Sequence, residues 1–487
     1  MVYAMDLTVL NLAIPAIAAQ FQPSSSQLLW MIDIYGFMVA GFLITMGTLG
    51  DRIGRRKLLL FGAGAFAIAS IIAAFSNSAS MLIAMRALLG IAGATVAPST
   101  MSLLRNMFHD ERQRQFAIGV WIASFSAGGV LGPLVGGGLL HWFGWSAVFL
   151  AAVPVMLLVL LLGPFLLPEY RDPNAGRIDL ASVGSSLTAV LALTYGVKQF
   201  AEFGPHLQSG AGIAVGVAFA VWFGRRQSRI AYPLLDVSLF RVPKFAGAIT
   251  AYGLSCFAMF GLYVFITQYL QLVLELSPLH AGIVTVPWSL AFALGSLITP
   301  KLTVRLAPSK VLIYGLLLAA IGFALIAAVH NPWAIWLLLV GTVAMALGLG
   351  PVFAICNEMM ITSAPPERAG AASALAETGS ELCGALGIAL LGSLGTALYR
   401  SNLLATIPDQ ISLSQRDQSI ATLAGALATA AQLPIELGAS VSNAARAAFV
   451  DAYQSASLIG GIIMLIAAVC CSKLLRPATG VMPATRP

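Results

Sequence analysis

The chain is a succession of long apolar segments separated by short polar ones. Fourteen of these segments have close to the 20 or so residues that a helix needs to cross the hydrocarbon core of a membrane. Their approximate bounds are 1–21, 27–49, 57–76, 81–104, 114–138, 145–168, 178–197, 209–224, 245–272, 280–300, 310–329, 332–360, 369–398 and 453–475. The pattern therefore predicts an all-α integral membrane protein with fourteen transmembrane helices.

Composition agrees with a membrane protein. Hydrophobic residues make up 59% of the 487 residues and charged residues only 9%, whereas a soluble protein carries about 25% charged residues. The net charge of +7 is not gathered into a basic patch interleaved with aromatic residues, so nucleic acid is excluded as a partner. We expect the lipid bilayer to be the surroundings of most of the chain.

The positions of the basic residues predict the orientation. Of the 26 Lys and Arg residues, 21 fall in alternate loops and in the C-terminal tail, and Arg86 falls inside a span. The opposite loops contain Lys198, Arg400, Arg416 and Arg446. Because basic loops stay in the cytoplasm, both termini are predicted to be cytoplasmic.

Two similar loops indicate repeated halves. Segment 47–60 joins the second and third spans, and segment 300–312 joins the tenth and eleventh. Weak similarity at corresponding loops is typical of transporters built from two halves. The predicted domains are an N-terminal six-helix bundle (1–168), an inserted seventh and eighth helix with a linker (169–244), and a C-terminal six-helix bundle (245–487). The long outer loop at about 399–452 is expected to form short amphipathic helices folded over the outer face.

Four carboxylates and one arginine interrupt the apolar spans. Asp6, Asp33, Glu377 and Glu381 lie at membrane depth, where a charge costs several kcal/mol and usually faces a pathway or a partner. Glu377 and Glu381 are four residues apart and share a helix face, so one of them is expected to hold a proton. Arg86 needs a buried partner, and Asp6 and Asp33 are both candidates.

The segment GTLGDRIGRRK (47–57) has the composition of a conformational latch. Its glycines allow a sharp turn, and its aspartate can accept hydrogen bonds at a helix N-terminus. Its arginines can clamp carboxylates or helix C-termini of the other half. The alternative is that the basic residues only enforce topology. The residues of the expected latch are Gly47, Asp51, Arg52, Gly54, Arg55 and Arg56.

The segment GGVLGPLVGG (128–137) places small residues along one helix face. Gly128, Gly132 and Gly136 follow one another at intervals of four, and Gly137 adjoins them. A neighbouring helix can pack closely along such a stripe, and Pro133 bends the helix. Ordinary close packing would explain the stripe without any further role.

Four segments together resemble the major facilitator superfamily. GTLGDRIGRRK resembles its signature loop, LIAMRALLGIAGA (82–94) its helix 4 motif, and GGVLGPLVGG the helix 5 motif associated with antiporters. MDLTVLNLAIP (5–15) resembles the helix 1 motif of the fourteen-helix drug:proton antiporter branch, the QacA and SmvA type.

The resemblance implies two six-helix bundles, an inserted helix pair and multidrug efflux. It implies a monomeric, proton-coupled antiporter in the bacterial cytoplasmic (inner) membrane that exports lipophilic cations. Quaternary ammonium antiseptics, cationic dyes and biguanides are the expected substrates, and protons are the second partner. Proton coupling and cation binding are expected at Asp6, Asp33, Glu377, Glu381 and Arg86.

Aromatic residues near these acids suit lipophilic cations, because the faces of aromatic rings attract cations. For any single ring, lipid contact or packing is the alternative. The possible cavity residues are Trp30, Tyr35, Phe125, Phe257, Tyr263 and Trp288, together with Glu358 as an entry group.

The sequence bears on three other functions. A proton-coupled importer, or an exporter of a non-cationic small molecule, would use the same fold. Relatives that favour divalent cations often have an acid in helix 10, where this chain has Gly295 and Ser296, so the charge preference stays open. An enzyme is not expected, since the sequence offers no metal-binding set, no nucleophile–base pair and no nucleotide-binding loop. No cofactor and no metal are predicted, and the energy for transport would come from an ion gradient.

Overall fold

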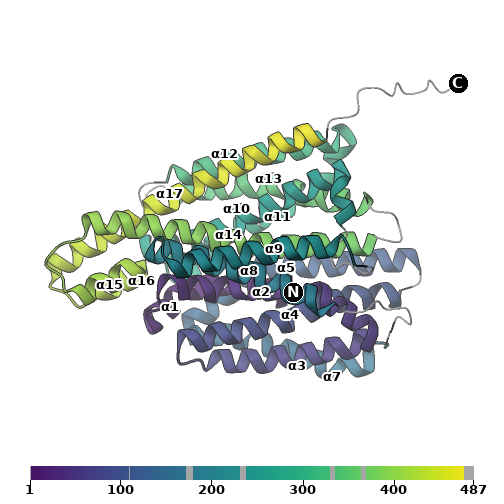
Figure 1. The fold of residues 1–487 in the computed structure, drawn as a ribbon, viewed down its shortest axis with the longest axis horizontal. Coiled ribbons are helices and arrows are strands. Elements are labelled where there is room, and N and C mark those ends of the chain that lie inside the picture. The colour runs from purple at the N-terminus through teal and green to yellow at the C-terminus, as the bar shows by residue number, and fades with distance from the viewer. Residues whose placement is uncertain are drawn as a thin grey trace.

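The structure is a computed structural model that describes residues 2–108, 110–169, 171, 179–230, 237–329, 335–363 and 369–475. The secondary structure of these residues is helical throughout (Figure 1), which confirms the all-α class. The helices are α1 (Val2–Phe21), α2 (Ser25–Ile53), α3 (Arg55–Ala74), α4 (Ala79–Met107), α5 (Glu111–Phe143), α6 (Ser146–Leu150), α7 (Ala152–Leu166), α8 (Leu180–Phe203), α9 (Leu207–Gln227), η1 (Val237–Arg241), α10 (Pro243–Gln268), η2 (Tyr269–Val273), α11 (Pro278–Arg305), α12 (Pro308–Ala327), α13 (Ile335–Thr362), α14 (Ala369–Thr406), α15 (Leu413–Ala421), α16 (Leu423–Ala430) and α17 (Ile435–Leu474).

Twelve spans in the described part of the chain are long and apolar enough to cross a membrane. One of them, Ser146–Leu166, combines α6 and α7, and another, Pro243–Val273, combines α10 and η2. Helices α1 and α5 are the other two members of the predicted set and are not among these twelve. The count of fourteen therefore stays a prediction.

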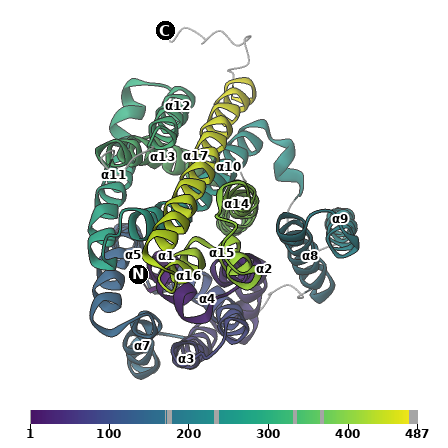
Figure 2. The ribbon, with the colours of Figure 1, turned by 90° about the vertical axis from the view of Figure 1, so that its left-hand side faces the viewer.

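The helices pack in two groups with a pair beside them. Helices α1 to α7 form the N-terminal half, and α10 to α14 with α17 form the C-terminal half; the domain bounds themselves stay a prediction. The seam between the halves is formed where α2 packs against α14 and α5 against α11. The inserted pair, α8 and α9, lies on one side of the molecule and contacts the seam through α8, which packs against α2 and α14 (Figure 2).

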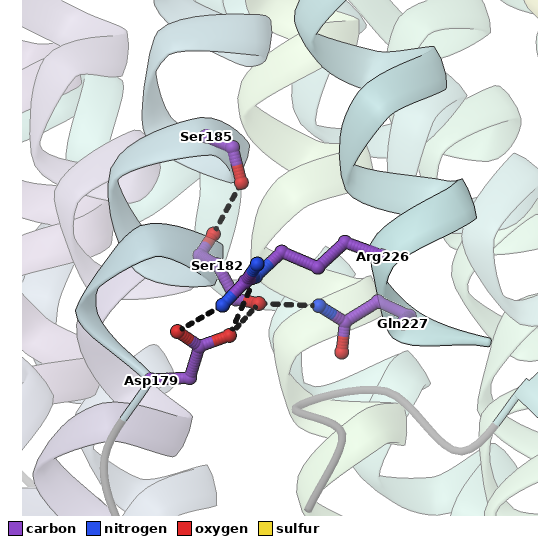
Figure 3. A network of polar contacts seen from close by, with 5 residues as sticks. All are labelled: Asp179, Ser182, Ser185, Arg226 and Gln227. Atoms are coloured by element: carbon purple, nitrogen blue, oxygen red, sulfur yellow. Dashed lines mark hydrogen bonds and ion pairs between the residues drawn. The ribbon is translucent and has the colours of Figure 1, made fainter. Parts of the chain in front are cut away.

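Glycines and a polar network hold the inserted pair together. A Cβ added at Gly196 would lie 2.6 Å from the backbone nitrogen of Ile213 on α9, so the two helices approach backbone to backbone. At the far end of the pair, Arg226 donates two hydrogen bonds of 2.8 and 2.9 Å to Asp179 (Figure 3). This contact lowers the pKa of the Asp179 carboxyl to about 2. Ser182 links Asp179 to α9 as well, because its hydroxyl accepts a 2.8 Å hydrogen bond from Gln227.

The long segment near the C-terminus differs from the prediction. Helix α14 continues to Thr406 and α17 begins at Ile435, so 399–452 is not mainly a set of short helices. With 38 and 40 residues, these helices are roughly 60 Å long at 1.5 Å per residue, about twice the hydrocarbon core. Both therefore project from one end of the bundle, and α15 and α16 lie between their ends (Figure 1). We call α15 and α16 the outer cap.

Hydrogen bonds join the two halves at the end that has the outer cap. Gln418 of α15 donates a 2.9 Å hydrogen bond to Gln22, next to α1. Gln271 of η2 donates a 3.0 Å bond to the backbone oxygen of Leu12 in α1. These contacts close the seam at this end.

Candidate functional site

A cavity lies between the two halves, near the middle of the seam. Its walls come from α1, α2 and α4 of the N-terminal half and from α10 and α14 of the C-terminal half. The lining residues are Leu10, Asn11, Ile32, Asp33, Gly36, Arg86, Phe260, Ser380, Glu381, Gly384, Ala385 and Ile388. This central cavity therefore brings together Asp33, Arg86 and Glu381, which are far apart in sequence.

The partner of Arg86 is Asp6. The Nη1 atom of Arg86 lies 2.7 Å from Oδ2 of Asp6, and its Nε donates a 3.3 Å hydrogen bond to the backbone oxygen of Met31. Its guanidinium also lies 4.6 Å from the ring centre of Tyr35. The Arg86 side chain is 2% exposed and that of Asp6 is 14% exposed. This set of contacts ties α4 to α1 and α2, and it leaves Asp33 to another cation.

That cation is Lys198, which the sequence analysis assigned to an outer loop. Helix α8 does not end at residue 197 but continues to Phe203. Lys198 therefore lies inside the helix, with its Nζ 3.0 Å from Oδ1 and 2.8 Å from Oδ2 of Asp33. Both side chains are 0% exposed. The ammonium group also lies 3.9 Å from the ring centre of Trp30. The available signal in the sequence was a lysine directly after an apolar span.

The C-terminal half contributes Glu381 from α14. Helix α14 is closely packed near this residue. A Cβ at Gly36 of α2 would lie 3.2 Å from Cβ of Ala385 across the seam, and one at Gly384 would lie 2.9 Å from the ring of Phe260 on α10, within the C-terminal half. Glu377 lies one helical turn before Glu381 and is not among the residues that line the central cavity. The two acids were expected to act as a pair, and the cavity brings together only one of them with Asp33.

Of the predicted aromatic residues whose side chains the structure describes, none lines the central cavity. Tyr35 packs under Arg86, as described above. Tyr263 and Trp288 pack edge to face within the C-terminal half, with ring centres 4.8 Å apart. Phe257 belongs to α10, where its backbone contacts Gly387 of α14.

The aromatic ring on the cavity wall is Phe260, one turn after Phe257. In a helix that is apolar on all sides, the sequence pattern does not reveal which aromatic residues face the seam. The side chain of Phe125 lies outside the described residues.

Glu358 lines a separate cavity within the C-terminal half. That cavity also includes Lys244, Met359 and Thr362, and Lys244 donates a 3.2 Å hydrogen bond to the hydroxyl of Thr362. Glu358 is thus remote from the central cavity in the described arrangement.

The Asp51 segment makes its described contacts within the N-terminal half. Arg55 donates a 2.8 Å hydrogen bond to Asp51, one turn earlier, and a 3.5 Å bond to the backbone oxygen of Pro98 on α4. Arg52 is exposed, and Gly47 lies next to Pro98. The clamp expected on the other half is not among these contacts, because Arg55 begins α3, which packs on α4 and α7.

Gly54 and Arg56 join this segment to the end of α7. Arg56 donates hydrogen bonds to the Glu169 carboxylate through its backbone nitrogen (3.1 Å) and to the backbone oxygen of Leu167 (2.9 Å). Gly54 has a φ of +116°, a conformation that L side chains rarely adopt, and a Cβ there would clash with Glu169. The glycine thus allows the turn that brings Glu169 over the start of α3.

The glycine-rich stripe of α5 lies on the seam. A Cβ at Gly136 would lie 2.9 Å from Val9 of α1, and one at Gly137 would lie 2.7 Å from the backbone oxygen of Pro278 on α11. Gly132 and Pro133 are buried, as is Gly128 one turn earlier. Close approach of α5 to α11 is therefore one of the main helix contacts that form the seam.

Comparison with known proteins identifies the relatives of this chain. The model of the family described as Major Facilitator Superfamily matches residues 1–388. The multidrug efflux pump LfrA of Mycolicibacterium smegmatis is 42% identical over 465 residues, which cover 96% of this chain and 92% of LfrA. The methyl viologen resistance protein SmvA of Salmonella typhimurium is 32% identical over 474 residues, 96% of this chain and 94% of SmvA.

A solved structure with the same fold is a bacterial homologue of the human lysosomal transporter Spinster in an inward-facing, unoccupied conformation. Its TM-score is 0.67 at 18% identity, and the match covers 98% of this chain and 96% of that chain. At this identity the likeness establishes the fold alone.

Proposed function

We infer the function of this chain from one premise: it belongs to the Major Facilitator Superfamily and is a membrane transporter. One relative is named a multidrug efflux pump and another a methyl viologen resistance protein, which supports drug efflux. We propose more specifically that it exports lipophilic cations, such as quaternary ammonium antiseptics, cationic dyes and biguanides, in exchange for protons.

One observation carries this proposal: carboxylates from both halves line the same cavity. Asp33 comes from α2 and Glu381 from α14, the two helices that meet along the seam. A buried carboxylate gains from binding either a proton or a cation, and it cannot bind both at once. When the halves rock against each other, a proton that enters from outside displaces the cation there, and release of the proton inside resets the site.

Charged groups in both halves support this cycle. The Arg86–Asp6 pair fixes α4 against α1 and α2, so the wall that holds Asp33 moves as a unit. The contacts of Asp51, Arg55 and Arg56 stabilise the turn between α2 and α3, and we propose that they bias one of the two conformations. Glu377 lies one turn from Glu381 on α14. It would bind the proton or the cation before that ligand reaches the cavity.

The orientation follows from the distribution of basic residues. The protein lies in the inner membrane of a bacterium, with both termini in the cytoplasm and the outer cap on the opposite side. In this orientation the hydrogen bonds of Gln418 and Gln271 close the outer end of the seam. The protein would work as a monomer, because both walls of the cavity come from one chain.

Ethidium transport in everted vesicles under an imposed pH gradient tests the proposal. The wild type should accumulate ethidium when the vesicle interior is acidic, and Glu381→Gln should abolish this accumulation. Glu436→Gln is the matched control, because Glu436 is an exposed acid at the start of α17 and its loss should leave transport unchanged.

Other outcomes would change the assigned coupling residue or the proposed substrate. Accumulation that persists in Glu381→Gln would place the coupling at Asp33, Asp6 or Glu377. A correctly inserted wild type that moves no ethidium would refute cation export and favour an importer or a non-cationic substrate.

A further inference from the structure

Lys198 brings a positive charge from the inserted pair into the wall of the central cavity. Helix α8 packs against α2 and α14, the two helices of the seam. Its lysine reaches Asp33, which lines the cavity, while Lys198 itself is not one of the lining residues. The lysine therefore approaches the acid from behind the cavity wall.

The surroundings of the ammonium group resemble those of a bound organic cation. Two carboxylate oxygens lie 2.8 and 3.0 Å from Nζ, and the face of Trp30 lies 3.9 Å away. A carboxylate and an aromatic face are the two groups that recognise a cationic ligand in an apolar site. Lys198 occupies such a site as a cation tethered to the protein.

Stability alone does not account for this pair. Replacing a buried ion pair by apolar residues of similar volume is often neutral or stabilising. Helices α8 and α14 could pack through apolar residues alone, because Val190 of α8 and Leu386 of α14 already pack against the same apolar cluster around Phe37. A buried charge retained at the edge of a cavity calls for a role in what the cavity binds.

The charges around the central cavity give that role. Among the described residues, the charged groups that line the cavity are Asp33, Arg86 and Glu381. Asp33 is paired with Lys198 and Arg86 with Asp6, so the count includes the lining residues and their ion-pair partners. With three negative and two positive groups ionised, the cavity has one net negative charge. A monovalent cation neutralises it, whereas a dication leaves an excess positive charge in a low-dielectric site.

We propose that Lys198 is the internal counter-ion that makes the central cavity select monovalent over divalent organic cations. The proposal rests on cation export as the function of the cavity. It also gives the inserted pair a role, since neither six-helix half contains this lysine.

The test compares two cations that differ mainly in charge. Ethidium is a monovalent phenanthridinium, and propidium has the same ring system with a second cationic group on its tail. Binding of each to purified protein in detergent at pH 8 is measured by fluorescence, and the ratio of the two dissociation constants is compared between variants. Because the ring system is shared, this ratio isolates the effect of the second charge.

Lys198→Met removes the charge and leaves a side chain of similar length. The variant should bind propidium about tenfold more tightly relative to ethidium than the wild type does, because the cavity then has two net negative charges. Lys198→Arg keeps the charge and should keep the wild-type ratio. The double variant Asp33→Asn with Lys198→Met restores one net negative charge, and its ratio should return toward that of the wild type.

The outcomes separate this proposal from the proposed function. A wild type that binds neither dye would overturn cation export itself. A wild type that binds ethidium, together with an unchanged ratio in Lys198→Met, would overturn only the role of Lys198. If Lys198 had a purely structural role, Lys198→Met would weaken the binding of both dyes alike, and the double variant would not restore that binding. If Lys198→Met is not monodisperse by size-exclusion chromatography, Lys198→Gln makes the same charge change.

Discussion

Replacing Arg86 by methionine should destabilise the N-terminal half. The substitution leaves Asp6 without the guanidinium that lies 2.7 Å away, and it removes the hydrogen bond to the backbone oxygen of Met31. At an effective dielectric constant of about 20, two charges at this separation attract by about 6 kcal/mol before desolvation is counted. Breaking a buried pair by removing one partner costs roughly 3–5 kcal/mol. Because Asp6 is 14% exposed and retains some access to water, the low end, about 3 kcal/mol, is expected.

The protein's own thiols provide the assay. Cys256, Cys356 and Cys471 are free and buried, so a thiol-reactive fluorophore reports unfolding of the purified protein during a thermal ramp. These thiols lie on α10, α13 and α17, so the ramp reports unfolding of the whole chain. With an unfolding entropy of roughly 2 cal/mol/K per residue over 487 residues, a loss of about 3 kcal/mol should lower the midpoint of Arg86→Met by about 3 °C.

A double-mutant cycle supplies the control. Asp6→Asn should cost less than Arg86→Met, because the amide oxygen can still accept the 2.7 Å hydrogen bond. The two substitutions together should cost less than the sum of their separate effects, with a coupling of about 2 kcal/mol or more. A cycle between Arg86 and Asp33 should show much weaker coupling. Strong coupling to Asp33 and none to Asp6 would refute the assignment of the pair.

Three further predictions concern other parts of the fold. Gly54→Ala should lower expression and the unfolding midpoint, because its Cβ meets the Glu169 carboxylate at a positive φ; a midpoint equal to the wild type would contradict the strained turn. Gly137→Val should abolish ethidium transport in everted vesicles, since its side chain would push the backbone of Pro278 away and open the seam between α5 and α11. Asp179→Asn should cost at most about 1 kcal/mol at pH 7, as the pair is partly exposed. The pKa of Asp179 is lowered to about 2, so its contribution is complete above about pH 4 and is lost as the pH falls toward 2; a loss already between pH 7 and 5 would show another group at work.

Hydrophobic periodicity was sufficient to predict the helical class and most spans. A run of about 20 apolar residues has few alternatives in a membrane, since its backbone must hydrogen-bond internally. The ends of helices in water were not predictable in the same way. Residues 435–452 are alanine-rich with polar spacing, and the structure continues α17 through them. The continuous apolar pattern begins only near residue 453, whereas the helix begins at Ile435. A helix need not begin where the composition of the chain changes.

Residue type was sufficient to identify the charged residues that line the cavity, but not the ion pairs that they form. The rarity of charge at membrane depth identified Asp33, Arg86 and Glu381, all of which line one cavity. The choice between Asp6 and Asp33 as the partner of Arg86 depends on helix rotation and depth, which periodicity does not determine. Phe257 and Phe260 show the same limit: both are aromatic residues of α10, and only the second lies on the cavity wall.

Lys198 shows why a topology rule can miss a buried charged residue. The rule counts basic residues near span ends, and a lysine after an apolar run satisfies it whether its ammonium group points into water or back into the protein. A long flexible stem makes both possible, and only a partner decides between them. Here Asp33, a buried acid on another helix, is the partner that holds the ammonium group inside the protein. A lone intramembrane acid and a lone basic residue at a nearby span end are thus better tested first as a pair, because each otherwise bears a desolvation cost that the other can offset.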